Sequence, residues 1–145
     1  MDWPRTGQVD SAIADFAKLG VKVMVTELDI DILPQPDRTA SAEISRRFQY
    51  EEKLDLYKNG LPDSVQQTLA KRYAELFVVF KKNSDKLTRV TFWGVTDGDS
   101  WLNTFPIAGR TSYPLLFDRR GKPNASFDAV IKVAGSLPKV SPDSH

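Results

Sequence analysis

Hydrophobic positions in the first part of the chain follow two patterns, one with the period of a helix and one typical of buried strands. Within residues 8–19, Ile13 and Phe16 lie at helical spacing, and Gly20 follows as a stop signal. The next segment, "VKVMV" at 21–25, is rich in β-branched residues, as are parallel strands that are covered on both faces. The pattern predicts a short helix followed by a buried strand.

A longer helical pattern begins near "LPDSVQQ". Its apolar positions keep a 3.6-residue period, at Val65, Leu69, Tyr73, Leu76, Phe77 and Phe80. Ser64 and Gln67 have the spacing of a capping box, which predicts that Ser64 caps this helix. A second buried-type strand, "TRVTFWGV" at 88–95, follows it.

The remainder of the chain consists of long connections and one more helix. Residues 33–49 contain two prolines and a polar cluster, which predicts a long connection with one short helical turn at most. A second long loop runs to about residue 122 and precedes a helix near 124–134, with Gly135 as its expected stop. The predicted order is αβαβα.

Alternating helices and strands predict an α/β fold with parallel strands joined by right-handed crossovers. Two such strands alone would leave open edges and an uncovered face, so we expect this chain to form part of a larger sheet. An eight-stranded (β/α)8 TIM barrel has about 250 residues, and the chain has 145. If the chain belongs to such a barrel, residues 1–138 form only part of it, and a polar tail follows at 139–145.

Composition excludes several function classes. The net charge is +1 with no basic block, which argues against nucleic acid as a partner. No apolar run approaches the roughly 20 residues of a membrane helix, so we expect no membrane partner. The absence of cysteine excludes disulfides and thiolate metal sites.

Carboxylates follow the first predicted strand at every second position. Glu27, Asp29 and Asp31 share one side of an extended chain, because side chains alternate with period two. The second strand likewise runs into a polar stretch, "TDGDSW". In a (β/α)8 barrel the active site lies at the C-terminal ends of the strands, which is where both acidic stretches occur.

Several motifs resemble the C-terminal part of glycoside hydrolase family 10, the endo-β-1,4-xylanases. These are "VTELDI", "VTFWGVTDGDSWL", "YPLLFD" and "KPNASFDAV", supported by "LYKNGLPDSVQQ" and "AKRYAELF". The resemblance covers nearly the whole chain. It implies a (β/α)8 barrel that cleaves the xylan backbone with retention of configuration, to which this chain would contribute strands seven and eight.

The resemblance assigns catalytic roles to two of the acids. The glutamate of the family's "TELD" motif is the nucleophile, and the matching residue is Glu27. Asp29 matches an orienting partner that acts with a histidine from the preceding strand. That histidine has no counterpart here, since the only histidine is His145 in the polar tail. The family's acid/base glutamate, on the fourth strand, has no counterpart either, so we expect the isolated chain to be nearly inactive.

Two tryptophans are the expected sugar-binding residues. Trp93 and Trp101 resemble the family's pair that encloses the sugar beside the nucleophile, and a flat indole can cover the C–H face of a pyranose. Core packing is the alternative for both, more so for Trp93 because strand residues flank it.

The other acids have simpler interpretations. An acid at the position of Asp31 is more often a turn or cap residue than part of a sugar groove. Asp97 and Asp99 could bind a metal, but "DGDSW" lacks the further acids of a calcium loop, so hydrogen bonds to nearby backbone are favoured. We expect neither a metal nor a cofactor.

Three other functions remain open. A metal-dependent glycosyltransferase could use Asp29 and Asp31, although no glycine-rich phosphate loop is present. A non-catalytic xylan-binding or scaffold piece would bind through Trp93 and Trp101 without turnover. Another retaining barrel glycosidase would share the strand-end glutamate.

The expected partners follow from the same interpretation. They are xylan or a xylo-oligosaccharide, together with the missing N-terminal part of the barrel or a second copy of this chain. The resemblance alone implies a secreted or periplasmic location, because the sequence contains no signal peptide.

Overall fold

Three helices and a two-stranded parallel sheet make up the regular structure of the parts of the chain that the computed structural model describes, residues 3–36 and 51–136. The helices are α1 (Thr6–Lys18), α2 (Asp63–Lys82) and α3 (Ala125–Gly135), and the strands are β1 (Val23–Leu28) and β2 (Leu87–Phe92). Three short 3-10 turns complete the structure, at Glu52–Leu54, Asp97–Asp99 and Trp101–Asn103. The predicted αβαβα order is confirmed.

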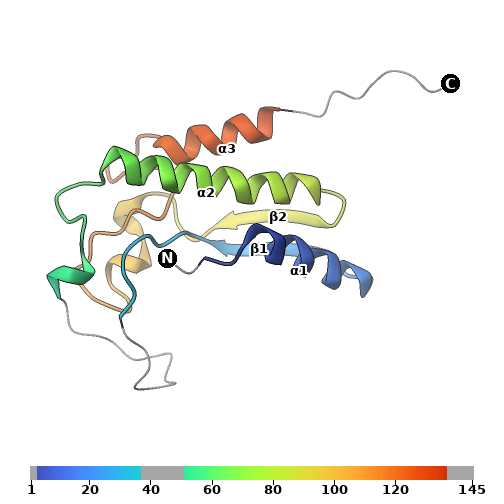
Figure 1. Cartoon of the computed structure of the whole chain (residues 1–145), viewed down its shortest axis with the longest axis horizontal. Coiled ribbons are helices and arrows are strands. Elements are labelled where there is room, and N and C mark those ends of the chain that lie inside the picture. Colours follow the sequence, from blue (N-terminus) through green and yellow to red (C-terminus); the bar gives the residue numbers. More distant parts are fainter. Residues whose placement is uncertain (1–2, 37–50, 137–145) are drawn as a thin grey trace.

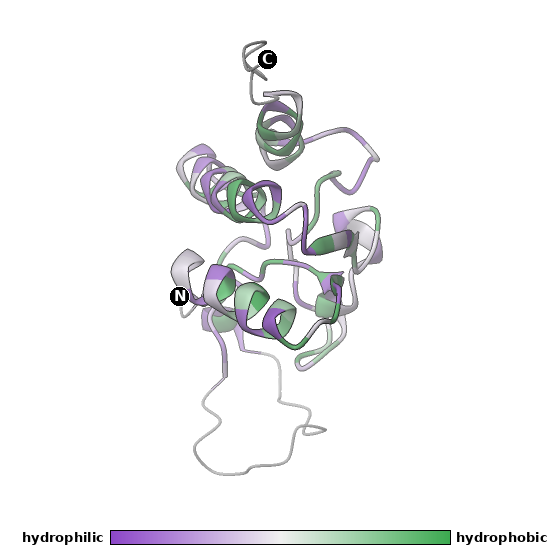
Figure 2. Cartoon of the chain, turned by 90° about the vertical axis from the view of Figure 1, so that its right-hand side faces the viewer, coloured by the Kyte–Doolittle hydropathy of each residue, from purple (hydrophilic) through white to green (hydrophobic). Residues whose placement is uncertain are grey.

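The elements form successive levels. Figure 1 shows α3 above α2, with β2 and β1 below α2 and α1 lying across β1. Both strands point toward the same end of the molecule, where the segments that follow them gather. The green, hydrophobic side of α2 is turned toward the strands in Figure 2, as its 3.6-residue period requires.

The core lies between the sheet and the helices. It contains these buried side chains: Ile13, Leu28, Ile30, Ile32, Leu69, Tyr73, Leu76, Val79, Phe80, Leu87 and Val130. Phe77 of α2 stacks on Phe92 of β2 with their ring centroids 6.0 Å apart, so aromatic packing joins the helix to the strand end.

Between Val25 and Leu28, β1 contains one residue more than the stretch of β2 beside it, whereas between Val23 and Met24 the extra residue lies on β2. Val25 pairs with Val90 and Leu28 with Phe92, so three steps on β1 match two on β2. This irregularity lets Val25 and Leu28 both face the helices, whereas strict alternation from Val25 would turn Glu27 into the core. The extra residue therefore keeps the Glu27 side chain on the side away from the helices.

Two predicted helix signals are wrong. The N-cap of α2 is Pro62 and its side chains make no capping bond, so Ser64 lies inside the first turn and Ser64 and Gln67 form no capping box. Proline fits this position because its φ is already helical, and Asp63 places a negative charge in the first turn, near the positive end of the helix dipole.

Gly135 is the last residue of α3 rather than its stop. The end of α3 is bonded by α2 instead: the Lys81 ammonium donates to the carbonyls of Val133 and Ser136. By contrast, Gly20 has φ +77° directly after α1 and ends that helix as predicted.

β2 is shorter than its hydrophobic pattern suggests. It ends at Phe92 rather than Val95, so Trp93 lies just beyond the strand and Val95 is exposed. Most of the segment 33–49, in which a helical turn is expected, lies outside the described residues. The tail at 139–145, including His145, lies wholly outside them. Within the described residues, none of the three helices has both the length and the apolar character needed to span a membrane.

Candidate active site

The acids after β1 and the buried residues between them alternate as the sequence predicts. Leu28, Ile30 and Ile32 are all buried, with exposed fractions of 9%, 5% and 3%. Glu27 is exposed and Asp29 is half-buried. The strand end thus has one apolar side turned to the helices and one acidic side turned away from them.

Trp93 joins this acidic side through the backbone. Its amide donates to the Leu28 carbonyl at 3.1 Å, which extends the sheet pairing by one step and holds Trp93 beside the end of β1. The next residue, Gly94, has φ +139°, and a Cβ there would lie 2.9 Å from Leu115. A glycine is therefore required where the chain leaves β2.

Trp101 reaches the same acids from the loop. Its indole Nε1–H donates to Asp29 Oδ2 at 2.7 Å, and its ring stacks on Phe105 at a centroid distance of 5.6 Å. The exposed fractions of Trp93 and Trp101 are 48% and 40%. Neither tryptophan packs in the core, so that alternative is wrong for both.

Asn103 stabilises the loop that carries Trp101. Its side-chain amide donates to the carbonyls of Asp97 and Gly98, and its Oδ1 accepts from the Ser112 amide and the Arg119 guanidinium. One side chain therefore connects three parts of the 97–119 segment and leaves Trp101 little freedom to move.

Asp97 fixes the start of the same loop. Its carboxylate is 2% exposed and accepts a hydrogen bond from the Leu115 amide at 2.9 Å, as the sequence favoured. Burial raises the pKa of Asp97 from 3.8 to about 7, and the Leu115 hydrogen bond and the charge of Arg119 only partly offset this. Asp99 accepts from the Thr96 hydroxyl.

Asp31 does form the turn that was expected, since its Oδ1 accepts from the Leu33 amide at 2.9 Å. Its Oδ2 also pairs with Arg110 Nη2 at 2.9 Å. Arg110 is 3% exposed and was not among the predicted site residues. A single arginine in a long loop, 79 residues from its partner, offers no signal in one sequence.

Burial and like charges act together on Asp29. Burial is the main cause that raises the pKa of Asp29, the neighbouring Asp31 and Glu27 raise it further, and the hydrogen bond from Trp101 opposes them. Within the described ranges, no group of three or more acidic, histidine or cysteine side chains is arranged to hold a metal ion.

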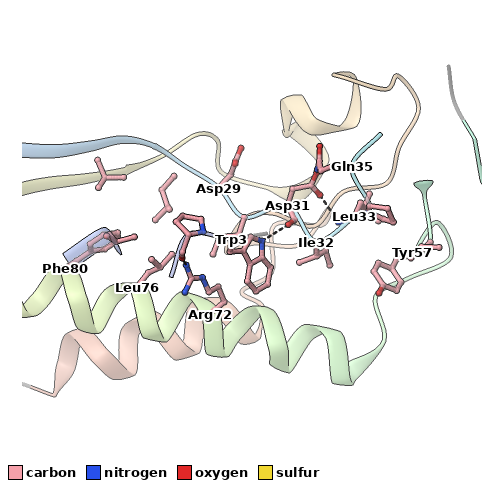
Figure 3. Close-up of a pocket in the computed structure, with 17 residues that line it drawn as sticks. Trp3, Asp29, Asp31, Ile32, Leu33, Gln35, Tyr57, Arg72, Leu76 and Phe80 are labelled. Carbon is pink, nitrogen blue, oxygen red and sulfur yellow. Dashed lines mark hydrogen bonds between the residues drawn. The ribbon is translucent and has the colours of Figure 1, made fainter. Parts of the chain in front are cut away.

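A cavity of about 970 Å³ lies beside β1, between the start of α1 and α2. Figure 3 shows Trp3 at its centre, where the indole N–H donates to the Asp31 carbonyl. The Arg72 guanidinium of α2 lies 5.7 Å from the Trp3 ring centroid and also donates to the Pro4 carbonyl. The N-terminal segment is thus fastened to both α2 and the end of β1.

Comparison with known proteins identifies the family. Residues 1–133 match glycosyl hydrolase family 10. The chain is 40% identical over 132 residues to endo-1,4-beta-xylanase A of Xylanibacter ruminicola, an alignment that covers 91% of this chain and 36% of that protein. It is 32% identical over 130 residues to the endo-1,4-beta-xylanase of Geobacillus stearothermophilus, covering 90% and 34%.

Solved structures agree with this assignment. A GH10 endoxylanase retrieved from a sugarcane soil metagenome superposes with a TM-score of 0.86 at 43% identity, over 91% of this chain and 38% of that one. A mutant structure in complex with xylotriose superposes with a TM-score of 0.67 at 32% identity, over 87% and 34%.

The comparisons also define how much of the family's architecture is present. The chain spans about a third of the length of the curated relatives it matches, with coverage of 36%, 29% and 32% for three of them. Its parallel strands and packed helices are consistent with part of the (β/α)8 barrel of that family. The fold, the motifs and the matches together show that the chain belongs to glycosyl hydrolase family 10.

Proposed function

We propose that this chain is part of a retaining endo-1,4-β-xylanase, in which it supplies the seventh and eighth strands, the nucleophile and part of the sugar-binding cleft. The observation that carries the proposal is the position of Glu27. Its carboxylate is exposed at the C-terminal end of β1, on the same side as the two exposed tryptophans that follow β2. Relatives named endo-1,4-beta-xylanases support xylan as the substrate.

Glu27 is the proposed nucleophile. In a retaining glycosidase an ionised carboxylate attacks the anomeric carbon, while a second, protonated carboxyl about 5 to 5.5 Å away protonates the leaving oxygen. A strand end suits this role, because the backbone pairing of β1 with β2 holds the attacking carboxylate at a fixed position. No described residue donates a hydrogen bond to the Glu27 carboxylate, so one face of it is accessible to a sugar.

Asp29 is the proposed orienting partner. It follows Glu27 by two residues on the same side of the chain, and the charge of Glu27 raises the pKa of Asp29. In this chain its hydrogen-bond donor is Trp101, which links the acid to the sugar-binding side of the cleft. Asp29 would thereby hold the indole by its N–H edge and leave one flat face free for a xylose ring to stack on.

The acid/base is the part of the mechanism that this chain does not provide. The family's acid/base glutamate precedes the region matched here, so we propose that a polypeptide with the earlier strands of the barrel must complete the site. The open edge of β1 supports this proposal, because among the described residues only β2 pairs with β1.

The test is xylan hydrolysis by complementation. The chain is assayed alone and after mixing with a polypeptide that carries the first six strands of a family member. We expect activity only in the mixture and expect Glu27→Gln, which keeps the shape but removes the charge, to abolish it. Asp99→Asn, at an acid of the outer loop, is the matched control and should leave the activity of the mixture intact.

Each result distinguishes one function from another. Strong activity of the lone chain would disprove the requirement for a second carboxylate from elsewhere. Binding of xylotriose with no turnover in any mixture would favour a non-catalytic xylan-binding piece. Because one relative is named a thermostable celloxylanase, cello-oligosaccharides are the second substrate to compare, and faster cleavage of them would identify another retaining glycosidase.

A further inference from the structure

The ion pair between Asp31 and Arg110 is an unusual feature of the site because both charges are withdrawn from water. The side chain of Arg110 is 0% exposed and that of Asp31 is 14% exposed, with 2.9 Å between Nη2 and Oδ2. Removing two charges from water is costly, and a buried pair is therefore weak evidence for stability by itself.

Arg110 is also incompletely satisfied. Its Nε and Nη1 are buried and make no hydrogen bond to the described residues. Two unbonded donor atoms add a desolvation cost that an apolar side chain would avoid. Because stabilisation alone explains this ion pair poorly, we explain it by the two segments that it holds together.

Those segments carry the two sides of the proposed cleft. Asp31 lies two residues beyond Asp29 on the same side of the β1 extension. Arg110 follows Gly109, whose amide donates to the Asn103 carbonyl at 2.9 Å, and Asn103 ends the 3-10 turn that begins with Trp101. The ion pair therefore ties the loop that holds Trp101 directly to the strand end that holds Asp29.

We propose that Asp31 and Arg110 are a positioning pair, which holds the Trp101 loop against the end of β1 and so keeps the Trp101 indole hydrogen-bonded to Asp29. This positioning role does not depend on the proposed function. Only its consequence for sugar binding rests on the proposed function.

Arg110 also supplies the positive charge beside Asp31. The titratable groups that act on Asp29 are Glu27 and Asp31 from its own segment, and the Tyr73 phenol of α2 faces it from the core. The charge of Asp31 raises the pKa of Asp29, and the size of this effect depends on how fully Arg110 neutralises Asp31. Loss of Arg110 should raise the pKa of Asp29 further, and loss of the Asp31 charge should lower it.

The test is a pH titration of the Trp101 indole N–H followed by nuclear magnetic resonance of the full chain. The three tryptophans give three indole signals, and Trp101→Phe identifies the one that belongs to Trp101. In the wild type we expect the Trp101 signal to shift with pH as Asp29 ionises. In Arg110→Met we expect that shift to shrink or disappear, and in Arg110→Lys, which keeps the charge, we expect part of it to return. In Asp31→Asn, which also breaks the ion pair, we expect the shift to shrink as well and its midpoint to move to lower pH.

Two controls separate positioning from general loss of stability. Val130→Ala removes volume from the core between α2 and α3, away from the site, and should lower stability without changing the Trp101 titration. If Arg110→Met does not fold, the double variant Asp31→Asn/Arg110→Met is measured instead, because it removes the ion pair without leaving a buried charge unpaired. A Trp101 shift of unchanged size in a folded variant without Arg110 would overturn the proposal.

A second arm separates this inference from the proposed function. Xylotriose is added to the wild type and to the Arg110 variants, and the shifts of the Trp93 and Trp101 signals are recorded. Shifts in the wild type that weaken in Arg110→Met support both ideas. No shift in any protein, combined with the expected pH titration, would argue against sugar binding by this chain and leave the positioning pair standing.

Discussion

Ionisation of Asp97 should lower the stability of this chain. Its pKa rises from 3.8 to about 7 in the folded protein, because burial disfavours the charged form. Between these two values the folded chain holds a proton that the unfolded chain has released. The contribution of Asp97 to stability is therefore greatest below pH 3.8 and is lost as the pH rises through 7.

The corresponding prediction compares two proteins across that window. The free energy of unfolding of the wild type, measured in urea, should fall between pH 3.8 and 7 more steeply than that of Asp97→Asn. The asparagine oxygen can still accept the Leu115 amide, so the loop contact is kept. Parallel pH profiles for the two proteins would show that Asp97 does not titrate in this range.

Asn103 should be the most sensitive uncharged residue of the loop. Replacing it with alanine removes the acceptor of the Ser112 amide and the donor to two carbonyls, which should cost about 1 to 3 kcal/mol of unfolding free energy. Thr104→Val is the neighbouring control, since the Thr104 hydroxyl bonds a carbonyl at the exposed surface and should matter by less than about 0.5 kcal/mol. Equal losses in urea unfolding would contradict the role given to Asn103.

At the residue scale the sequence predicts the positions of side chains better than their partners. Glu27 and Asp29 could be placed on one side of the strand end because side-chain alternation is a local rule. The hydrogen bond between Asp29 and Trp101 and the pair between Asp31 and Arg110 join residues 72 and 79 positions apart. Such contacts depend on the path of a long loop, which local patterns do not determine.

The ends of the helices show the same difference at the scale of elements. The periodic apolar positions located α2 correctly, but the choice of its first residue depended on competing caps at Pro62 and Ser64. The backbone of proline favours Pro62, so the serine was left within the helix with its side chain exposed. Helix interiors are thus easier to predict than their termini.

A pair of alanine substitutions tests these two helix starts. Ser64→Ala should change the unfolding free energy by less than about 0.5 kcal/mol, since Ser64 caps nothing. Asn124→Ala should cost about 0.5 to 2 kcal/mol, because the Asn124 side chain accepts from the amides of Ser126 and Phe127 at the start of α3. Thermal unfolding followed by circular dichroism would show the difference. A larger loss for Ser64→Ala than for Asn124→Ala would show that Ser64 does cap α2.

The extra residue in β1 gives a second prediction for this element. Deletion of Thr26 should leave the chain folded, because Val25 and Leu28 would then alternate regularly and still face the helices. Deletion of Asp29 should unfold it, since Ile30 would turn outward and Asp31 inward. Asp29→Ala keeps the chain length and is the control. A folded protein after deletion of Asp29, by circular dichroism, would argue against this register.

The whole molecule exposes a large part of its apolar surface. Met24, Trp93 and Val95 are all about half exposed or more, at 51%, 48% and 68%, on or just after the sheet. Parallel strands are normally covered on both faces, so this surface should attract another polypeptide. The sequence predicted both a helix-facing side and an uncovered side of the sheet, whereas the exposed residues on the uncovered side are visible only in the structure.

The prediction for the whole molecule concerns a hydrophobic dye. The isolated chain should enhance the fluorescence of anilinonaphthalene sulfonate while remaining folded, and the complementing six-strand polypeptide should reduce that signal as it covers the sheet. Met24→Lys, placed on the bare side, should reduce dye binding without loss of helicity. A chain that binds no dye in the absence of a partner would show that its exposed apolar residues form no continuous surface.

The contact of Lys81 with the end of α3 has a consequence for the order of folding. Ser136 bonds the carbonyls of Lys132 and Val133 locally, whereas the Lys81 ammonium of α2 donates to the carbonyls of Val133 and Ser136, and α3 provides no left-handed glycine of its own at its end. α3 can therefore begin locally at Asn124, but the bonds from Lys81 that complete its end form only after α2 lies beside it. We expect amide protection to appear first in α2, then at the start of α3 and last at its end, so that α3 grows in one direction along a helix already in place.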